Sequence, residues 1–92
     1  MASHAAVTQA VGTLVAATVD TITFNSDCEI VEVWADAELT FRVDGGTPVS
    51  DDDEGYNIPV AGARQVRIPT SGNTVVKLIS AGTPNYVVTK IS

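Results

Sequence analysis

Residues 18–35 read Thr-Val-Asp-Thr-Ile-Thr-Phe-Asn-Ser-Asp-Cys-Glu-Ile-Val-Glu-Val-Trp-Ala, and this stretch decides the fold class. In its first part Asp20, Ile22 and Phe24 lie on one face of an extended chain, and threonine and valine lie on the other. Residues 28–35 alternate in the same way, and the Asn-Ser-Asp between the two parts is typical of a turn. Because successive side chains of a strand point to opposite faces, this alternation predicts two β-strands.

The rest of the chain shows the same short, turn-bounded segments. It contains 14 Val, 6 Ile and 11 Thr but only three Leu, and β-branched side chains favour sheet over helix. The sequence therefore predicts an all-β fold, a compact β-sandwich of about seven or eight short antiparallel strands. We expect the last two strands to form a terminal hairpin. Besides the two strands above, the predicted strand segments are residues 39–43, 56–60, 64–68, 74–80 and 85–91, and residues 7–16 could form a first strand, an arm, or both.

Ninety-two residues are enough for one domain. Residues 1–12 are small and uncharged apart from His4, so we interpret them as an N-terminal arm that packs on a neighbouring polypeptide chain. Residues 13–92 form the single β-sandwich domain. The side chains expected in its core are apolar and alternate along the strands: Ile22, Phe24, Val31, Val33, Leu39, Phe41, Val43, Val66, Ile68, Leu78 and Val88.

Composition excludes several partners. Five basic residues against eleven acidic ones give a net charge of −6, whereas a nucleic-acid binder needs clustered cations. No apolar run approaches the roughly 20 residues of a membrane span. The first residues lack the basic and apolar regions of a signal peptide, so we expect none and expect synthesis in the cytoplasm. A single cysteine, Cys28, allows neither an intrachain disulfide nor a cysteine-based zinc site.

The sequence offers no arrangement for catalysis. The one histidine, His4, lies in the predicted arm, so no general base is positioned beside a serine or cysteine nucleophile. Gly45-Gly46 is followed by Thr-Pro rather than by the lysine of a phosphate-binding loop. We therefore predict no enzymatic activity, no catalytic residue and no cofactor.

The acidic run from Asp51 to Glu54 has two interpretations. It could bind calcium, because hard cations prefer carboxylate oxygens. Adjacent side chains of an extended chain point in opposite directions, however, and the run lacks the spacing of a calcium loop, so a solvated loop is favoured. We assign no metal site.

Charge is divided unequally along the chain. All eleven acids and one base, Arg42, lie in residues 1–54, and the other four bases lie in residues 55–92. Opposite charges could pair within one subunit, or an acidic surface could dock onto the basic part of a neighbour; the sequence does not separate these. The candidate interface residues are Val7, Val11, Arg64, Arg67, Lys77, Asp51, Asp52 and Asp53.

Trp34 lies on the same strand face as Ile30, which favours packing in the core or at an interface. The alternative is a sugar-binding platform, for which Trp34 and Tyr56 or Tyr86 would have to be accessible together.

Three segments carry a resemblance to a known group of proteins. They are Val43-Asp44-Gly45-Gly46-Thr47-Pro48, Tyr56-Asn57-Ile58-Pro59 and residues 75–86, Val-Val-Lys-Leu-Ile-Ser-Ala-Gly-Thr-Pro-Asn-Tyr. With residues 19–24 they resemble small β-rich structural proteins of tailed bacteriophages, notably those that infect actinobacteria. The similarity covers roughly residues 18–91, and the acidic run Asp51–Glu54 is longer than in that pattern. These are turn-and-strand motifs, so they bear on the fold more than on chemistry.

The resemblance implies a structural protein of the virion. The expected function is that of a head decoration, or capsid cement, protein, which binds the outside of the shell formed by the major capsid protein and stabilises the head. The expected assembly is a homo-oligomer, with a homotrimer favoured. The alternative function is a virion-borne module that binds carbohydrate or a host surface, as on a head fibre or tail appendage.

Overall fold

The two alternating segments quoted above form strands in different sheets. In the computed structural model, which describes residues 3–25, 29–43, 46–49, 55–67 and 75–91, β3 (Asp20–Phe24) and β4 (Ile30–Ala35) pack across one core. Asp20, Ile22 and Phe24 are the buried residues of β3, as their spacing predicted. The all-β sandwich is confirmed: the described residues form nine strands and no helix.

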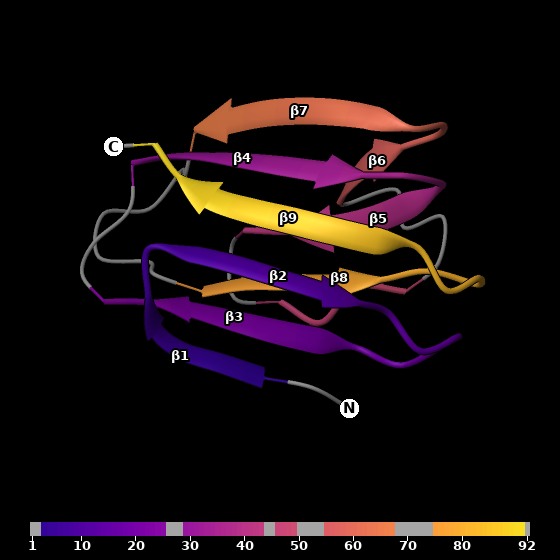
Figure 1. Ribbon diagram of the computed structural model, residues 1–92, viewed down its shortest axis with the longest axis horizontal. Helices are drawn as coiled ribbons and strands as arrows, with labels where there is room; N and C mark the ends of the chain where they lie inside the picture. The colour runs from indigo at the N-terminus through magenta and orange to yellow at the C-terminus, as the bar shows by residue number, and fades with distance from the viewer. Residues whose placement is uncertain (1–2, 26–28, 44–45, 50–54, 68–74, 92) are drawn as a thin grey trace.

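Sheet A has five strands in the order β1-β3-β8-β5-β6, and sheet B has four in the order β2-β9-β4-β7. Figure 1 looks onto the outer face of sheet B, whose strands pass in front of sheet A. Strand pairs are antiparallel except for β1 and β3, which run parallel. The remaining strands are β1 (Ser3–Val7), β2 (Gln9–Thr13), β5 (Leu39–Arg42), β6 (Tyr56–Ile58), β7 (Gly62–Arg67), β8 (Val75–Ile79) and β9 (Asn85–Lys90).

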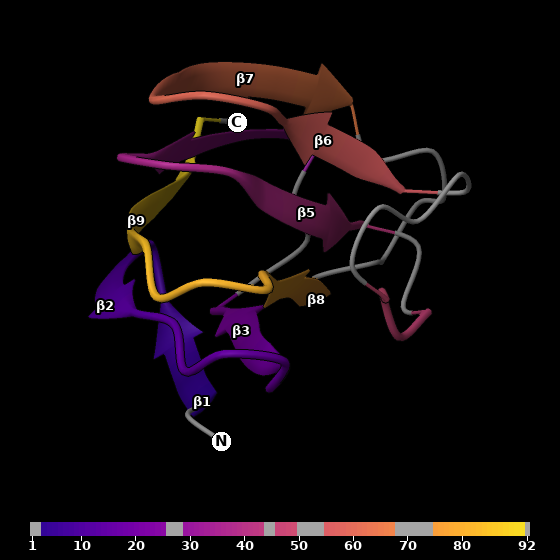
Figure 2. The same cartoon turned by 90° about the vertical axis from the view of Figure 1, so that its right-hand side faces the viewer.

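The sandwich is closed at both sides by consecutive strands that change sheet. At one side the chain leaves β1 in sheet A and enters β2 in sheet B through Thr8. At the other side β6 ends before Pro59, which has no N–H to donate to a ladder, and the chain crosses to β7. Figure 2 shows the two crossings at opposite ends of the layers.

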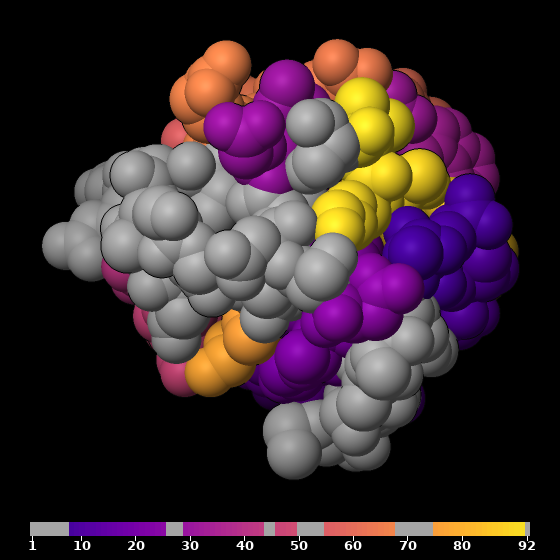
Figure 3. Space-filling view, turned by 90° about the vertical axis from the view of Figure 1, so that its left-hand side faces the viewer, coloured from indigo at the N-terminus to yellow at the C-terminus, as the bar shows by residue number. Residues whose placement is uncertain are grey.

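Residues 3–12 of the predicted arm lie within the two sheets rather than apart from them. Strand β1 pairs with β3, and β2 pairs along its length with β9, where Ala10 is buried. Figure 3 shows the chain just after its start (indigo) directly against the last strand (yellow). The expected boundary between arm and domain, after residue 12, falls inside β2. The chain instead changes from sheet A to sheet B at Thr8.

The terminal hairpin predicted from residues 74–91 is wrong. Strand β8 pairs with β3 and β5 in sheet A, whereas β9 pairs with β2 and β4 in sheet B. The connection between them crosses the end of the sandwich and is held by the β2–β3 connection. Its Ser80 carbonyl accepts from the Ala17 N–H at 2.8 Å, and its Pro84 carbonyl accepts from the Leu14 N–H at 2.9 Å.

The core lies between the sheets and contains the expected apolar side chains, apart from Ile68, which lies outside the described residues. The core residues that the sequence pattern missed are Ala10, Leu14, Ala35, Ile58, Val76 and Tyr86. The described part of the chain contains no helix long and apolar enough to cross a membrane.

Candidate functional site

The most buried polar contact in the described chain joins the two sheets. The Tyr86 hydroxyl of β9 donates to Asp20 Oδ2 of β3 at 2.9 Å, and the side chains are 0% and 1% exposed. Burial raises the pKa of Tyr86 above its usual value, and the hydrogen bond to Asp20 and the negative charge of Asp20 raise it further. This pair connects the two sheets. Because solvent does not reach it, it is not a site for a substrate.

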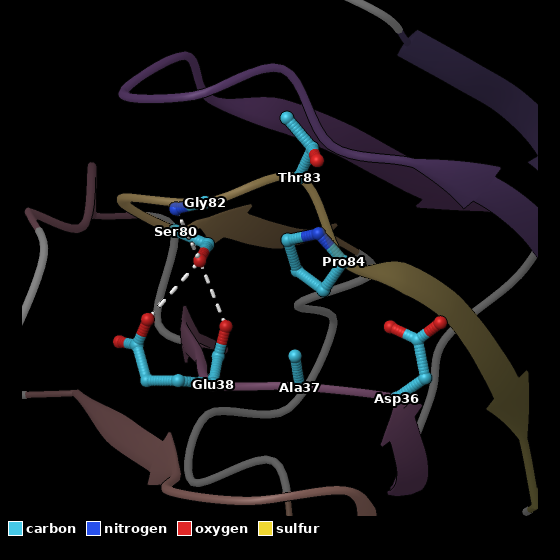
Figure 4. A pocket seen from close by; sticks show the side chains of 7 residues that line it. All are labelled: Asp36, Ala37, Glu38, Ser80, Gly82, Thr83 and Pro84. Carbon is cyan, nitrogen blue, oxygen red and sulfur yellow. Dashed lines mark hydrogen bonds between the residues drawn. The ribbon is translucent and has the colours of Figure 1, made fainter.

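The pocket at the end of the sandwich lies between the β4–β5 and β8–β9 connections and has a volume of about 340 Å³ (Figure 4). Its two acids are engaged by the chain itself. Asp36 accepts from the backbone N–H and the side-chain amide of Asn85, both at 2.9 Å. The Ser80 hydroxyl lies 2.8 Å from the Glu38 carbonyl and 3.1 Å from its carboxylate. These contacts fix the two connections, and the described residues contain no His, Cys, Asp or Glu group that could hold a metal ion.

A second pocket, of about 330 Å³, lies at the β6–β7 corner. The guanidinium of Arg64 lies 4.8 Å from the centre of the Tyr56 ring, and Tyr56 stacks on Phe41 at 5.5 Å. Arg64, a predicted interface residue, therefore packs against its own subunit.

The aromatic residues do not form one platform. Tyr86 is fully buried, and Tyr56 is half-buried at the edge of the core between Phe41 and Arg64. Trp34 is 37% exposed on the other side of sheet B, so it is not a core residue. The joint accessibility that a sugar platform requires is not present among these three residues, and no contact here favours the carbohydrate-binding alternative.

The outer face of sheet B carries an apolar row that crosses all four of its strands. The register places Val11 of β2 opposite Val87 of β9, Val87 opposite Trp34 of β4, and Trp34 opposite Ala63 of β7. Val11 is 64% exposed, Ala63 is exposed and Val87 is half-buried. We call these four residues the apolar row.

Polar side chains flank the apolar row on both sides and bond to each other. On one side Gln9 donates to Thr89 at 3.2 Å, and Gln65 donates to Glu32 at 2.9 Å. On the other side the Thr13 hydroxyl donates to the side chain of Asn85, which in turn donates to Asp36. The polar groups beside the row are therefore used within the sheet, whereas the row itself stays partly accessible to solvent, with Trp34 37% exposed and Val87 half-buried.

The predicted interface residues do not gather on one surface. Val11 belongs to the apolar row, and Arg67 lies on the same face of sheet B, on β7 opposite Ile30. Lys77 lies on sheet A, opposite Arg42, and Val7 lies in β1 of that sheet. The predicted Asp51, Asp52 and Asp53 lie outside the described residues.

Among the described strand pairs, the register places no opposite charge directly across from Glu32, Arg67 or Lys77. Glu32 faces Gln65, Arg67 faces Ile30, and Lys77 faces Arg42. The contact of a basic residue with an acid of another subunit stays a prediction.

Sequence reasoning placed Trp34 and Ile30 on one face but missed the apolar row. The row depends on which residues of four strands stand side by side, and the chain segments involved are far apart in sequence. The only signal was local: each strand has an apolar residue on the face opposite its core side chains.

Comparisons of the chain with models of protein families, with curated proteins and with solved structures gave no match.

Proposed function

We propose that this chain is a non-enzymatic structural protein of a tailed-phage virion, a decoration protein that binds the outer surface of the capsid shell and stabilises it. The proposal rests on the resemblance carried by residues 43–48, 56–59 and 75–86, together with one structural observation. That observation is the apolar row on the outer face of sheet B.

The apolar row supports a function in association. Apolar surface in water is a source of binding free energy, and a contiguous exposed patch bordered by polar side chains is typical of protein–protein contact sites. Here an exposed Trp34 lies at the middle of such a patch. Tryptophan is enriched among the residues that contribute most to interfaces, because it buries a large area with few rotatable bonds.

The polar groups of the domain support the same function. Asp20, Glu38 and Asp36 each hold two parts of the chain together, and no described buried side-chain nitrogen or oxygen lacks a hydrogen bond. Catalytic sites need polar groups that are poised for a substrate, whereas these groups serve the fold. A decoration protein needs a folded domain with a surface for association, and the β-sandwich with its exposed apolar row is compatible with that requirement.

The proposal is tested by binding to shells. Capsids of the phage that encodes the chain are prepared without it, mixed with purified protein, and separated by sedimentation. We expect saturable binding at a fixed number of copies per shell, and a higher melting temperature of the decorated shells, because a ligand of the assembled state stabilises that state.

Two variants give this test its control. Trp34→Ser removes the centre of the apolar row, and Val60→Ser removes an apolar side chain that is 70% exposed at the β6–β7 corner, away from the row. We expect Trp34→Ser to weaken shell binding and Val60→Ser to leave it near the wild-type value. Absence of binding by the wild-type protein would overturn the proposed function.

A further inference from the structure

We propose that the apolar row docks onto a patch of the shell that is apolar at its centre and carries lysine or arginine side chains at its borders. The inference deepens the proposed function and rests on it, because it names the chemistry of the partner at the same surface. It is carried by the position of two carboxylates, one on each side of Trp34.

Glu32 and Asp36 stand two residues before and two residues after Trp34, so they border the apolar row on its two sides. Alternate residues of an extended chain share one face and lie roughly 7 Å apart. Asp36 follows the end of β4, and its bonds to Asn85, the neighbour of the core residue Tyr86, hold it at this face. The other described side chains that border the row are uncharged.

The two acids are held in place but are not neutralised. Gln65 donates to Glu32 at 2.9 Å, and the side chain of Asn85 donates to Asp36 at 2.9 Å. Both donors are neutral amides, so each carboxylate keeps its negative charge and has lone pairs left for a further donor. Because the bonds already restrict the two side chains, less conformational entropy is lost when a partner binds them.

The remaining charges do not change the sign at the row. Arg67 lies on the same face, but the register places it opposite Ile30 rather than opposite either acid. The chain as a whole carries a net charge of −6. A partner that covers the row therefore meets negative charge at both of its borders.

This charge pattern determines which partner fits the row. An acidic border on the partner would place like charges together, which costs binding free energy. Lysine and arginine combine an apolar stem, which can lie along the row, with a cationic head that can reach Glu32 or Asp36. A shell patch with an apolar centre and basic borders therefore matches both the row and the acids beside it.

Three isosteric variants test the proposal in the shell-sedimentation assay. Glu32→Gln removes a charge beside the row and keeps an acceptor for Gln65, whereas Glu38→Gln removes the same charge at the pocket at the end of the sandwich. Glu32→Gln should weaken shell binding roughly two- to fivefold. Glu38→Gln should bind like the wild type, and Arg67→Gln, which removes a base from the face, should bind at least as tightly. Thermal melting of each variant verifies that it is folded.

Salt gives a second readout of the same charge. Raising the salt concentration from about 0.05 to about 0.5 M should weaken shell binding by the wild type, because exposed charges are screened. The same increase should weaken binding by Glu32→Gln less, since one of the two acids is then absent.

Peptide probes test the chemistry of the partner without shells. The probes are acetyl-Lys-Leu-Val-Leu-Lys-amide and acetyl-Glu-Leu-Val-Leu-Glu-amide, titrated to about 10 mM, where weak contacts are detectable. Trp34 is the one tryptophan of the chain, so its fluorescence reports on the row. The lysine peptide should change the emission of Trp34 and the glutamate peptide should not, and Glu32→Gln should reduce the response.

The outcomes separate this inference from the proposed function. Shell binding of equal strength in Glu32→Gln and Glu38→Gln, or shell binding that salt does not weaken, would overturn the basic partner and leave the decoration function standing. A wild-type protein that binds no shell would overturn the decoration function. Equal responses to the two peptides would then overturn the basic partner as well, whereas a preference for the lysine peptide would support it.

Discussion

The hydroxyl of Tyr86 in sheet B and the carboxylate of Asp20 in sheet A form a 2.9 Å hydrogen bond through the core. Both side chains are buried, and the Tyr86 ring also covers Gly12, the residue opposite it on β2. One side chain of β9 therefore contacts β2 within its own sheet and bonds to β3 in the opposite sheet.

Tyr86→Phe removes one donor to a buried carboxylate and should lower the free energy of unfolding by about 1–3 kcal/mol. The pKa of Tyr86 is raised in the folded state, so above about pH 10 the unfolded chain releases this proton first and wild-type stability falls as pH rises. The phenylalanine variant should lack this part of the alkaline loss. Urea unfolding at a series of pH values measures both effects.

Tyr56→Phe is the matched control, because it removes a hydroxyl from the other tyrosine without touching Asp20. Equal losses in the two variants, or an alkaline slope unchanged in Tyr86→Phe, would contradict the role of the Tyr86–Asp20 bond.

Gly12→Ala should be destabilising by about 1–3 kcal/mol. A Cβ at this position would lie 2.7 Å from the Tyr86 hydroxyl oxygen and 2.9 Å from Cζ, so the ring would have to shift and its bond to Asp20 would suffer. Gly62→Ala on edge strand β7 is the control, since its Cβ would meet its nearest atom at 3.9 Å. If thermal unfolding gave the two variants the same stability, the tight contact with Tyr86 would be refuted.

The sequence predicted well the features that depend on local periodicity. The buried faces of β3 and β4 follow from alternation, because burial alternates with the direction of the side chains. Alternation does not predict which strands pair with each other. Strands β8 and β9 have the pattern of a hairpin, but each pairs with strands distant in sequence. Tyr86 escaped notice as a core residue because the partner of its hydroxyl, Asp20, is 66 residues away in sequence.

The apolar row was only partly predicted, because it too depends on which strands pair with one another. Val11 was singled out in the sequence, but its neighbours in the apolar row come from three other strands, and only the register brings them together. The N-terminal residues were expected to lie apart from the domain because they are small. Their pairing with β3 and β9 uses backbone groups, which every residue possesses whatever its side chain.

Ala17→Gly should stabilise the protein by about 0.5–1 kcal/mol. Ala17 has a φ of 56° in the turn where the Thr18 N–H donates to the Val15 carbonyl, and glycine adopts this conformation without strain. Ala16→Gly, one residue earlier and with no such φ, should be neutral or destabilising. A melting temperature that falls in both variants would argue against strain at Ala17.

Deletion of residues 2–10 should lower the stability of the isolated subunit, contrary to the expectation for a free arm. It removes the parallel partner of β3 and the first half of β2, including the buried Ala10. Val11→Ser, which changes an exposed side chain and leaves the backbone pairing, serves as the comparison. A truncated protein that melts with the full-length chain would show that these strands add nothing to the fold.

Cryo-electron microscopy of the particle would show whether the protein decorates the outside of a capsid, as we propose. Heads of the encoding phage are compared with heads of a deletion strain and with deletion heads to which purified protein has been added back. We expect regularly placed density on the outer surface of the shell that is lost in the deletion and restored by the added protein. Identical shell surfaces in the three samples, or density found only on the tail, would contradict it.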